Sequence, residues 1–370
     1  MAPIRVLQIV PTLGYGGVAQ FLLNYYKEMD KSQIIFDFIT HGSEESFHAD
    51  LLKSGTKIFY VKSFGKVGFN GYLKQLKEIF DNNQYDIVHT HDGHLTGLTA
   101  MMCKRYFKGP VFCHAHTTRC VNDKHRPFMP VFRFLSRHYG DKLLGCGVKA
   151  CEYCYGKNSK FTVIHNAVSL DRFWNVKKED VDDLKASLQI SNDAFVIGHI
   201  GLFSPQKNHF YIIKIFNYLL EKHPNAILVL VGGGEMKSDI ENRTKELGIY
   251  NNIRFVGIQK NIPLYMHMFD TFILPSVHEG LPVCGVEAQS VVSNICFADT
   301  IDKDVDAGIG TTHFIPIDEQ SLPEWEKFIF AEKEQPSKEK IKDCFIQHGY
   351  EINESVKTLF NIYKETANKK

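Results

Sequence analysis

Short apolar runs alternate with segments of helical periodicity along the first 120 residues. Residues 4–10, 34–40 and 111–114 are apolar runs of strand length, and residues 18–29 repeat apolar side chains at the spacing of a helix. Strands that alternate with helices predict a parallel α/β sheet with right-handed crossovers. The other elements predicted here are strands at 57–61 and 86–89 and helices near 44–53, 72–82 and 95–106.

The alternation starts again in the second half of the chain. The charged stretch 177–183 follows the last predicted strand of the first sheet, near residue 161. At 370 residues the chain is too long for one ordinary core and suits two domains of ~150–200 residues each. We therefore predict an N-terminal domain over residues 1–168 and a C-terminal domain over 169–349. New strands are predicted at 194–201, 226–231, 253–257 and 271–274.

Composition narrows the class of protein. The net charge of +1 argues against a whole-protein nucleic-acid binder, so we predict no nucleic-acid partner. No apolar run approaches the ~18–20 residues of a membrane span, and the first residues lack the pattern of a signal peptide. The nine cysteines have no framework spacing and suit a reducing compartment. These features predict a cytoplasmic protein.

One stretch, residues 270–290, combines a strand, a loop and a helix. Residues 271–274 are a short apolar strand, and Pro282 suits the first turn of a helix. Glu279 lies in the loop, and Glu287 follows eight residues later on the helix. At the carboxyl end of a parallel sheet, loop amides at a helix N-terminus suit a phosphate, and a carboxylate one turn further suits a ribose diol. A sugar nucleotide has both groups. The alternative is that the first glutamate only caps the helix and the second is solvated.

The segment from Glu279 to Glu287 resembles the E-x7-E motif of the family-4 retaining glycosyltransferases, which have the GT-B fold. Its continuation through Glu-Ala-Gln is similar to members that build bacterial capsular polysaccharide or exopolysaccharide. The resemblance implies two Rossmann-like parallel-sheet domains that face an interdomain cleft, the first binding the acceptor and the second a nucleotide-sugar. It also implies that the last helix, at about residues 350–370, crosses back to the N-terminal domain.

The resemblance also implies roles for single residues. Glu279 is implied to lie near the transferred sugar as a catalytic residue, and Glu287 to bind the donor ribose. The amides of Gly280 and Leu281 are implied to bind the diphosphate. Lys207, which follows the strand predicted at 194–201, can reach the same diphosphate as a point charge and stabilise its departure.

Four further positions match the family less completely. Relatives commonly have an arginine before that lysine, where this chain has Leu202, so one cation of the expected pair is missing. The loops that contain Gly234 and Gly257 are placed to meet the nucleobase and ribose of the donor. Asn166 matches an asparagine in the family's interdomain segment, with Ala167 in place of a glycine, and is an acceptor-side candidate.

A glycine-rich segment directly follows the first predicted strand. Residues 14–19 read G-x-G-x-x-A, which is also the form of a dinucleotide-binding fingerprint. That fingerprint requires an acidic residue at the end of the second strand, but Asp37 lies in the middle of that strand and His41 at its end. An NAD-binding protein is therefore not predicted. In the resembled family a glycine-rich loop here packs close to the donor phosphates or the reacting sugar, a role that Gly16 and Gly17 fit.

Two predicted strands lead into pairs of histidines, His89 with His91 and His114 with His116. Histidines at the carboxyl ends of parallel strands face the ligand-binding edge of the sheet. The alternative is that they satisfy backbone groups or are partly solvated. The resemblance implies that His116 lies beside the donor sugar as a catalytic residue, with His114 as the alternative. His91 and His114 are also acceptor-side candidates.

Three groups of residues have metal-binding chemistry without the spacing that a site requires. The four histidines, with Asp92, lack a fixed ligand spacing, and the cysteine cluster 146–154 lacks a second pair for zinc. The acidic run 302–306 resembles the D-x-D motif of the other glycosyltransferase class without its strand-end context, and we interpret it as a polar loop. We predict no metal and no required cofactor, the nucleotide-sugar being a substrate.

Positive charge is concentrated between residues 104 and 142. This stretch has nine Lys and Arg residues and only two acidic ones, with Phe128, Val131, Phe132 and Leu135 among them. The mixture is typical of a surface that contacts anionic lipid, although a mobile loop followed by an ordinary amphipathic helix has the same pattern. We predict a peripheral protein at the inner face of the cell membrane.

Together these features predict a retaining hexosyl- or N-acetylhexosaminyltransferase in cell-surface polysaccharide synthesis. Its donor would be a nucleotide-sugar, with a UDP-sugar the first expectation, and its acceptor a saccharide or a polyprenyl-diphosphate-linked saccharide. Positioning and charge stabilisation would carry the reaction, rather than a protein nucleophile. Two alternatives stay open: a sugar-nucleotide epimerase of the same fold, and a non-catalytic sugar-nucleotide-binding module, which the missing arginine at Leu202 favours.

Overall fold

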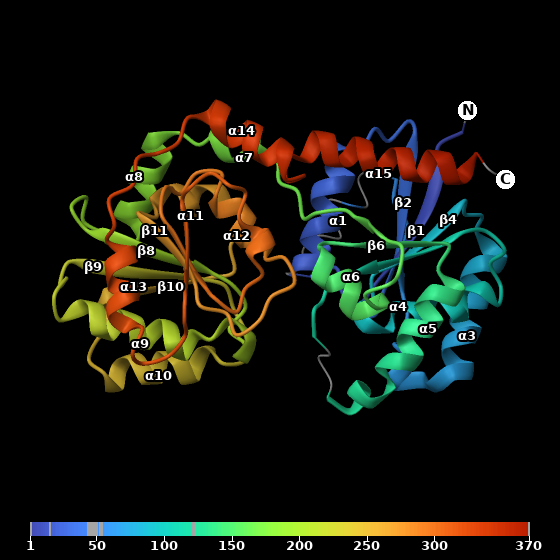
Figure 1. Cartoon of the computed structure of the whole chain (residues 1–370), viewed down its shortest axis with the longest axis horizontal. Coiled ribbons are helices and arrows are strands. Elements are labelled where there is room, and N and C mark those ends of the chain that lie inside the picture. The colour runs from blue at the N-terminus through green and yellow to red at the C-terminus, as the bar shows by residue number, and fades with distance from the viewer. Residues whose placement is uncertain (1, 15, 43–50, 52–54, 120–122, 369–370) are drawn as a thin grey trace. The chain divides into compact units, whose positions relative to one another are not determined.

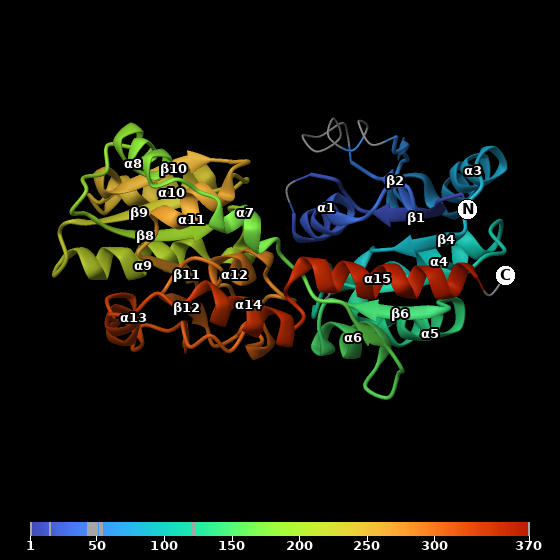
Figure 2. The ribbon, with the colours of Figure 1, turned by 90° about the horizontal axis from the view of Figure 1, so that it is seen from above.

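The chain divides into two compact units, each built around one sheet (Figures 1 and 2). The computed structural model describes residues 2–14, 16–42, 51, 55–119 and 123–368. Unit 1 comprises Met1–Ala167 and Ile352–Lys370, and unit 2 comprises Val168–Glu351. The division lies next to the boundary expected between residues 168 and 169, and the last helix, α15 (Ile352–Ala367), is grouped with unit 1.

Unit 1 has a seven-stranded parallel sheet in the order β3-β2-β1-β4-β5-β6-β7. The strand order reverses between β1 and β4, and open α/β sheets bind their ligands at the carboxyl ends of strands beside such a reversal. The strands are β1 (Ile4–Val10), β2 (Ile34–Thr40), β3 (Ile58–Tyr60), β4 (Ile87–Thr90), β5 (Val111–Ala115), β6 (Lys142–Gly145) and β7 (Thr162–Val163).

Helix α15 belongs to the core of unit 1 because its apolar residues recur on one face. Ile352, Val356, Leu359 and Tyr363 follow the spacing of helical turns, and all four are buried in the same cluster as residues of α1 (Gly17–Glu28) and the sheet. Figures 1 and 2 show α15 alongside α1. The other long helices of unit 1 are α3 (Phe64–Asn82), α4 (Thr96–Lys104), α5 (Met129–Tyr139) and α6 (Val148–Tyr155).

Unit 2 repeats the arrangement with a six-stranded parallel sheet in the order β10-β9-β8-β11-β12-β13. Here the reversal lies between β8 and β11. The strands are β8 (Phe195–Ile200), β9 (Ala226–Val231), β10 (Ile253–Gly257), β11 (Thr271–Leu274), β12 (Ile295–Ala298) and β13 (Thr312–Ile315). The helices are α7 (Leu170–Trp174), α8 (Lys178–Ser187), α9 (His209–Leu220), α10 (Lys237–Glu246), α11 (Ile262–Met268), α12 (Val283–Ala288), α13 (Leu322–Ile329) and α14 (Lys338–Gln347).

Several elements differ from the sequence-based expectations. Strands β6, β12 and β13 were not predicted, whereas β4 and β11, which also have four residues, were. Helix α3 begins at Phe64 rather than near residue 72, since the helix resumes after a break at Gly68 with φ 68°. Helix α12 ends at Ala288 rather than Val292, where the Ser290 hydroxyl donates to the carbonyl of Glu287. The helix predicted at 44–53 lies outside the described residues apart from Leu51.

Candidate functional site

Two loops of unit 2 meet at the reversal of its sheet. The loop after β8 supplies Lys207, and the loop after β11 supplies Glu279; the Lys207 Nζ lies 2.7 Å from the Glu279 Oε1. The Gln206 Nε2 donates to the other carboxylate oxygen at 3.1 Å. Because β8 and β11 are neighbours in the sheet, residues 72 positions apart in the sequence form one charged group.

Backbone contacts fix these two loops to each other. The amide of Val277 donates to the carbonyl of Gln206 at 2.9 Å, and the Asn208 side-chain amide donates to the carbonyl of Pro275 at 3.1 Å. Asn208 has φ 56° and precedes α9, a left-handed conformation that asparagine tolerates better than most residues. The loop that carries Lys207 therefore turns sharply into a helix while its side chains face the β11 loop.

The Lys207–Glu279 pair is largely shielded from water. The two side chains are 16% and 8% exposed. Burial alone lowers the pKa of Lys207, but the Glu279 carboxylate beside it raises that pKa above its ordinary value. The lysine is therefore charged, and its charge holds the glutamate in one orientation.

Glu287 lies on α12 in a different setting. Its side chain is buried, and its carboxylate has no hydrogen-bond partner within the described residues. Burial raises the pKa of Glu287 to about 7, and the charge of Arg172 acts in the opposite direction. The hypothesis of a helix cap and a solvated glutamate is wrong, because Glu279 pairs with the lysine, Pro282 precedes α12 without a side-chain cap, and Glu287 is buried.

The backbone of the neighbouring loops by itself explains why glycine occupies positions 234 and 257. Gly234 has φ +152°, and a Cβ there would lie 2.6 Å from the carbonyl oxygen of Phe203. Gly257 has φ +71°, and its carbonyl accepts from the amide of Gly232 at 2.8 Å. Close packing therefore requires glycine at position 234, and the left-handed backbone favours it at position 257, with or without a donor. Beside Glu279, Gly280 is half-buried and Leu281 is buried.

Three polar residues of this edge were not predicted. Gln206 orients Glu279, and His199 and His209 lie buried behind Lys207 with their ring centroids 4.8 Å apart. Burial lowers the pKa of His209 to about 3 and that of His199 well below its ordinary value. The only sequence signal was proximity: all three lie within eight residues of the lysine.

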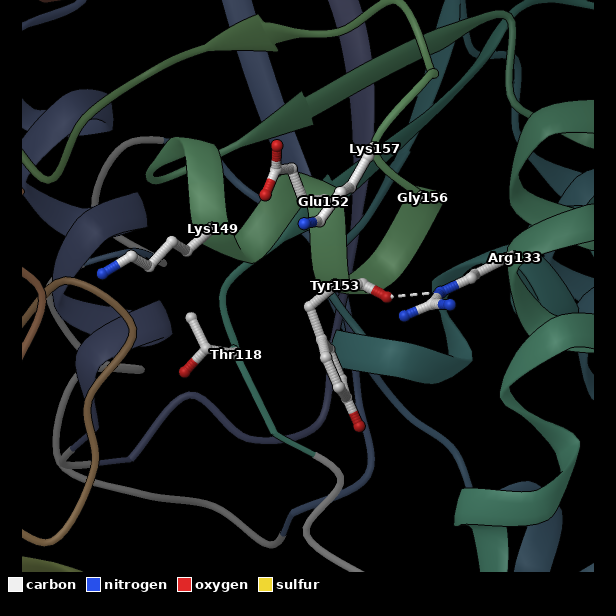
Figure 3. Close-up of a pocket in the computed structure, with 7 residues that line it drawn as sticks. All are labelled: Thr118, Arg133, Lys149, Glu152, Tyr153, Gly156 and Lys157. Carbon is white, nitrogen blue, oxygen red and sulfur yellow. Dashed lines mark hydrogen bonds between the residues drawn. The ribbon is translucent and has the colours of Figure 1, made fainter. Parts of the chain in front are cut away.

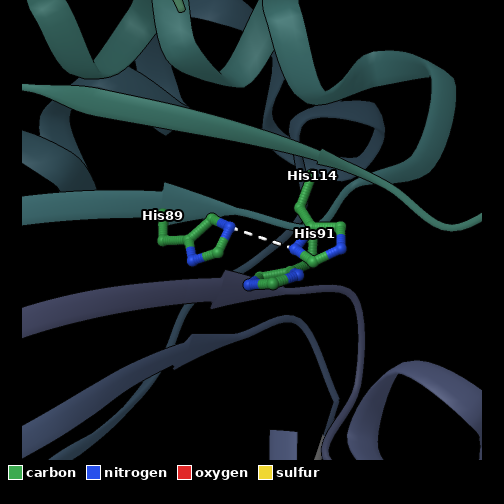
Figure 4. A group of neighbouring side chains, drawn as sticks. All are labelled: His89, His91 and His114. Atoms are coloured by element: carbon green, nitrogen blue, oxygen red, sulfur yellow. Dashed lines mark hydrogen bonds between the residues drawn. The ribbon is translucent and has the colours of Figure 1, made fainter. Parts of the chain in front are cut away.

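The reversal of the unit 1 sheet holds a cluster of histidines. His89 on β4 and His114 on β5 have ring nitrogens 3.2 Å apart, and His91 lies against both (Figure 4). The Nδ1 of His91 lies 2.9 Å from the Nε2 of His116, which is half-buried. The structure therefore brings together all four histidines singled out from the sequence.

These histidines are neutral because burial disfavours their charged form. Burial lowers the pKa of His116 to about 3 and that of His89, His91 and His114 well below the ordinary value. Ring nitrogens of these last three lie within 4.8 Å of one another, which is the one such metal-type grouping among the described residues. The nitrogens that face each other in His89 and His114 share a hydrogen bond, so a metal would have to displace it.

The remaining candidates of unit 1 lie along the same carboxyl edge. A Cβ at Gly16 would meet no atom within 4 Å, so packing inside the unit does not require glycine there. Gly17 is the first residue of α1. Asn166 is buried after β7, next to Ala167, whose carbonyl accepts from the Asn24 side chain at 3.2 Å.

A pocket of about 490 Å³ lies beside this edge, between α5, α6 and the loop after β5 (Figure 3). Three cations and one acid are among its lining residues: Arg133, Lys149, Lys157 and Glu152. Thr118, two residues beyond His116, also lines it. The pocket is therefore positively charged overall.

Residues that could suggest an NAD site or a metal site have structural surroundings instead. Asp37 pairs with Arg5 and accepts from the amide of Lys57 at 2.8 Å, so it stabilises the sheet rather than facing a ribose. Asp302 and Asp306 accept from backbone amides of their own turns. The cysteines 146, 151 and 154 are buried thiols, and they form no metal-type grouping within the described residues.

Comparison with known proteins adds independent findings. The model for "Glycosyltransferase Family 4" matches residues 15–172, and the model for "Glycosyl transferases group 1" matches residues 180–297. The putative glycosyltransferase EpsF of Bacillus subtilis (strain 168) is 30% identical over 99% of this chain and 97% of its own length. The UDP-Gal:α-D-GlcNAc-diphosphoundecaprenol α-1,3-galactosyltransferase of Escherichia coli is 27% identical over 79% of both chains.

Solved structures share the fold at low identity. A glycosyltransferase from Rickettsia africae ESF-5 superposes with a TM-score of 0.79 at 18% identity, over 100% of both chains. HepE of Anabaena, in complex with UDP and glucose, gives a TM-score of 0.72 at 16% identity, over 99% of this chain and 98% of its own. The predicted GT-B fold with two parallel sheets is confirmed.

Proposed function

The chain belongs to the glycosyltransferases with group 1 and family 4 domains, and on that basis we propose that it moves a hexosyl or N-acetylhexosaminyl group, with retention, from a UDP-sugar to a polyprenyl-diphosphate-linked saccharide. The observation that carries the proposal is the buried Lys207–Glu279 pair with Glu287 nearby on the following helix. The name of the E. coli relative combines UDP-galactose with a diphosphoundecaprenol-linked sugar, and HepE was crystallised with UDP and glucose.

In this proposal unit 2 binds the donor. The diphosphate lies against the amides of Gly280 and Leu281 and shares Lys207 with Glu279. The ribose hydroxyls donate to Glu287, whose carboxylate has no hydrogen bond within the described residues. A diol supplies two donors to one carboxylate, which compensates for the burial that raises its pKa.

Catalysis then rests on the departing diphosphate. Negative charge grows on it as the glycosidic bond breaks, and Lys207 already lies charged in a shielded position, so little reorganisation accompanies the reaction. Glu279, held by Gln206 and the lysine, orients the transferred sugar. No protein nucleophile takes part, and retention follows from attack on the face that the diphosphate leaves.

Unit 1 binds the acceptor in the same proposal. The neutral histidines suit sugar hydroxyls, which need hydrogen-bond partners without charge. The cationic pocket lined by Arg133, Lys149 and Lys157 suits the acceptor diphosphate, and Thr118 joins it to the loop that carries His116.

A coupled assay tests this function. Purified protein is incubated with each of a panel of nucleotide-sugars, with and without a lipid-diphosphate-linked saccharide, and free nucleotide and product anomer are measured. The proposal expects UDP release that depends on the acceptor and an α-linked product from an α-linked donor. Conversion of the donor sugar without acceptor would identify an epimerase. Donor binding without any turnover would identify a binding module.

We also propose that helix α5 contacts the membrane that carries such an acceptor. Phe128, Val131 and Phe134 are 56%, 52% and 55% exposed at a spacing of three residues, close to the exposed cations Lys124 and Arg126. Phe132 and Leu135, expected on this surface, are half-buried. Among the described helices, none combines the length and apolar composition that crossing a bilayer needs.

Two other cations of this stretch hold the fold of unit 1 together. The Arg133 Nε donates to the carbonyl of Tyr153 at 2.8 Å, and the Arg137 guanidinium to that of Tyr155 at 2.6 Å, so both hold the end of α6. A test of membrane contact therefore changes Lys124 and Arg126 instead.

Vesicle co-sedimentation is the measurement. Lys124→Glu with Arg126→Glu should reduce binding to anionic vesicles about tenfold or more, since each cation contributes about 1 kcal/mol near such a surface. Lys340→Glu with Lys342→Glu makes the same charge change on exposed residues of α14 and should have little effect. Equal binding of unaltered protein to neutral and anionic vesicles would contradict the proposal.

A further inference from the structure

The four histidines of unit 1 form two hydrogen-bonded rows. In the first, the His91 Nε2 lies 2.9 Å from the Gln8 Oε1, and its Nδ1 lies 2.9 Å from the His116 Nε2. In the second, the His89 Nδ1 lies 2.7 Å from the Tyr363 hydroxyl, and its Nε2 bonds His114 (Figure 4). Each row thus begins at a non-histidine side chain and ends at a histidine of the β5 strand or the loop after it.

The rows lie one upon the other. The rings of His89 and His91 have centroids 4.2 Å apart, and those of His114 and His116 are stacked at the same distance. The rows join at Tyr363 of helix α15, because the Gln8 Nε2 donates to its hydroxyl oxygen at 3.2 Å. One buried hydroxyl therefore connects the C-terminal helix to both rows.

With the Gln8 amide oriented as in the structure, the positions of the hydrogens follow from the acceptor atoms. The Gln8 Oε1 only accepts, so the His91 Nε2 carries a hydrogen. A neutral imidazole has one N–H, so the His91 Nδ1 accepts, and the His116 Nε2 must donate to it. That donation leaves the His116 Nδ1 without a hydrogen.

Tyr363 ties the direction of the first row to that of the second. Its oxygen accepts from Gln8, so its own hydrogen is donated to the His89 Nδ1. With the Gln8 amide turned over, the amide would donate to His91, and the His116 Nδ1 would carry the hydrogen instead. Tyr363 would then donate to Gln8 and accept from the His89 Nδ1, so the second row would have to reverse as well. The orientation of one buried amide, which Tyr363 couples to the second row, thus decides whether His116 offers an acceptor or a donor.

We propose that Tyr363, acting through Gln8 and His91, is a positioning residue that sets the tautomer of His116 and so presents its Nδ1 as a hydrogen-bond acceptor to a sugar hydroxyl. The Nδ1 has no partner within the described residues and is not among the buried unpaired nitrogens, unlike the Nε2 of His114. The contact to a sugar rests on the proposed function, whereas the tautomer does not.

The test is NMR of protein labelled with ¹⁵N-histidine. Two-bond ¹H–¹⁵N correlations distinguish the two neutral tautomers, and the signals lost in His116→Gln assign the residue. Unaltered protein should show His116 with its hydrogen on Nε2, and Tyr363→Phe should show both tautomers because the Gln8 amide is released. Gln8→Met removes the same link from the other side and should give the same mixture of tautomers. It replaces Tyr363→Phe as the test if that variant folds poorly.

Activity supplies a second readout. Tyr363→Phe should lower kcat about tenfold, the effect of one hydrogen bond in the transition state, with KM for the donor little changed. Tyr25→Phe is the matched control: it removes another buried hydroxyl of unit 1, which donates to the carbonyl of His165 at 2.6 Å, and should leave the tautomer unchanged.

Two results would overturn the proposal: a hydrogen on the Nδ1 of His116 in unaltered protein, or one unchanged tautomer in Tyr363→Phe and Gln8→Met. Because these spectra need no substrate, they stand even if the proposed transferase activity is not found.

Discussion

The two units share one winding pattern but place different chemistry at the same position. Each sheet reverses its order beside a central strand, at β1 and β4 in unit 1 and at β8 and β11 in unit 2. At that edge unit 1 holds four neutral histidines, whereas unit 2 holds the charged Lys207–Glu279 pair and Glu287. The fold therefore supplies the place for a ligand, and the charge of a few side chains decides its kind: neutral rings suit hydroxyls, and a shielded cation suits a diphosphate.

The largest expected difference between the two units is in their stability at low pH, where unit 1 should lose more stability than unit 2. The four histidines of unit 1 have folded pKa values far below the ~6.5 of an unfolded chain. Their contribution is therefore complete above pH 6.5 and is lost progressively as pH falls below that value. In unit 2 His199 and His209 act likewise, but Glu287 opposes them, because its raised pKa favours the folded state at low pH.

Both tryptophans, Trp174 and Trp325, lie in unit 2, so their fluorescence reports that unit alone. During an acid titration, far-UV circular dichroism should lose part of its signal near pH 5 while tryptophan emission stays native. Coincident changes of both signals, or an earlier change in emission, would contradict the comparison.

Removing the cation of unit 2 should have the next largest effect. Lys207→Ala takes away the charge that, in the proposed function, stabilises the departing diphosphate, so kcat should fall about a thousandfold, or ~4 kcal/mol. Lys214→Ala is the matched control, because this exposed lysine of α9 pairs with Glu319 on the surface. Thermal melts check folding, since the change leaves a buried carboxylate without its partner. If most activity survives, another cation holds the diphosphate.

Glu287→Gln should stabilise unit 2 in a pH-dependent manner. A folded pKa of about 7, against ~4.5 unfolded, means that the carboxyl costs stability as pH rises from 4.5 to 7 and costs most above pH 7. The variant should therefore be more stable by up to about 3 kcal/mol at pH 8 and nearly unchanged at pH 4.5. Urea unfolding, monitored by tryptophan fluorescence, measures this difference in the free energy of unfolding. Equal stability of the variant and the unaltered protein at pH 8 would show that the carboxylate is solvated.

The same residue should affect donor binding in the opposite direction. Glu287→Ala should weaken binding of a UDP-sugar by ~1.5–3 kcal/mol, about 10- to 150-fold, because the ribose loses a charged acceptor. Affinity in unaltered protein should rise between pH 6 and 8 as Glu287 ionises, and calorimetry with a UDP-sugar avoids the titration of a terminal phosphate. Unchanged affinity in the folded variant would assign the ribose to another residue.

The smallest expected effect comes from adding a positive charge to unit 2. Leu202 is 45% exposed, so an arginine there would stay hydrated. Leu202→Arg should tighten binding of UDP by about 1 kcal/mol, roughly fivefold, by restoring a second cation near the diphosphate. Leu202→Gln adds a side chain of similar length without charge and should change little. Equal affinities of the two variants would mean that position 202 does not reach the phosphates.

The sequence by itself determined the longer strands and helices and the parallel arrangement of both sheets. Apolar runs and helical periods are local patterns, so they can be read without the fold. Glu279 and Glu287 were found because their spacing lies within one strand, loop and helix. Three of the five four-residue strands, β6, β12 and β13, were missed, because the sheet pairing that holds so short a strand is not a local pattern.

Only the tertiary structure decided what those residues contact. Lys207 meets Glu279, and His91 meets His116, through strands that become neighbours only in the sheet. The role of Gln206 and the link from Tyr363 to His89 were invisible in the sequence, since a hydrogen bond between positions 274 apart has no local pattern. Burial decided the rest: whether a histidine is neutral or a carboxylate is solvated depends on the atoms that surround it, and those come from distant parts of the chain.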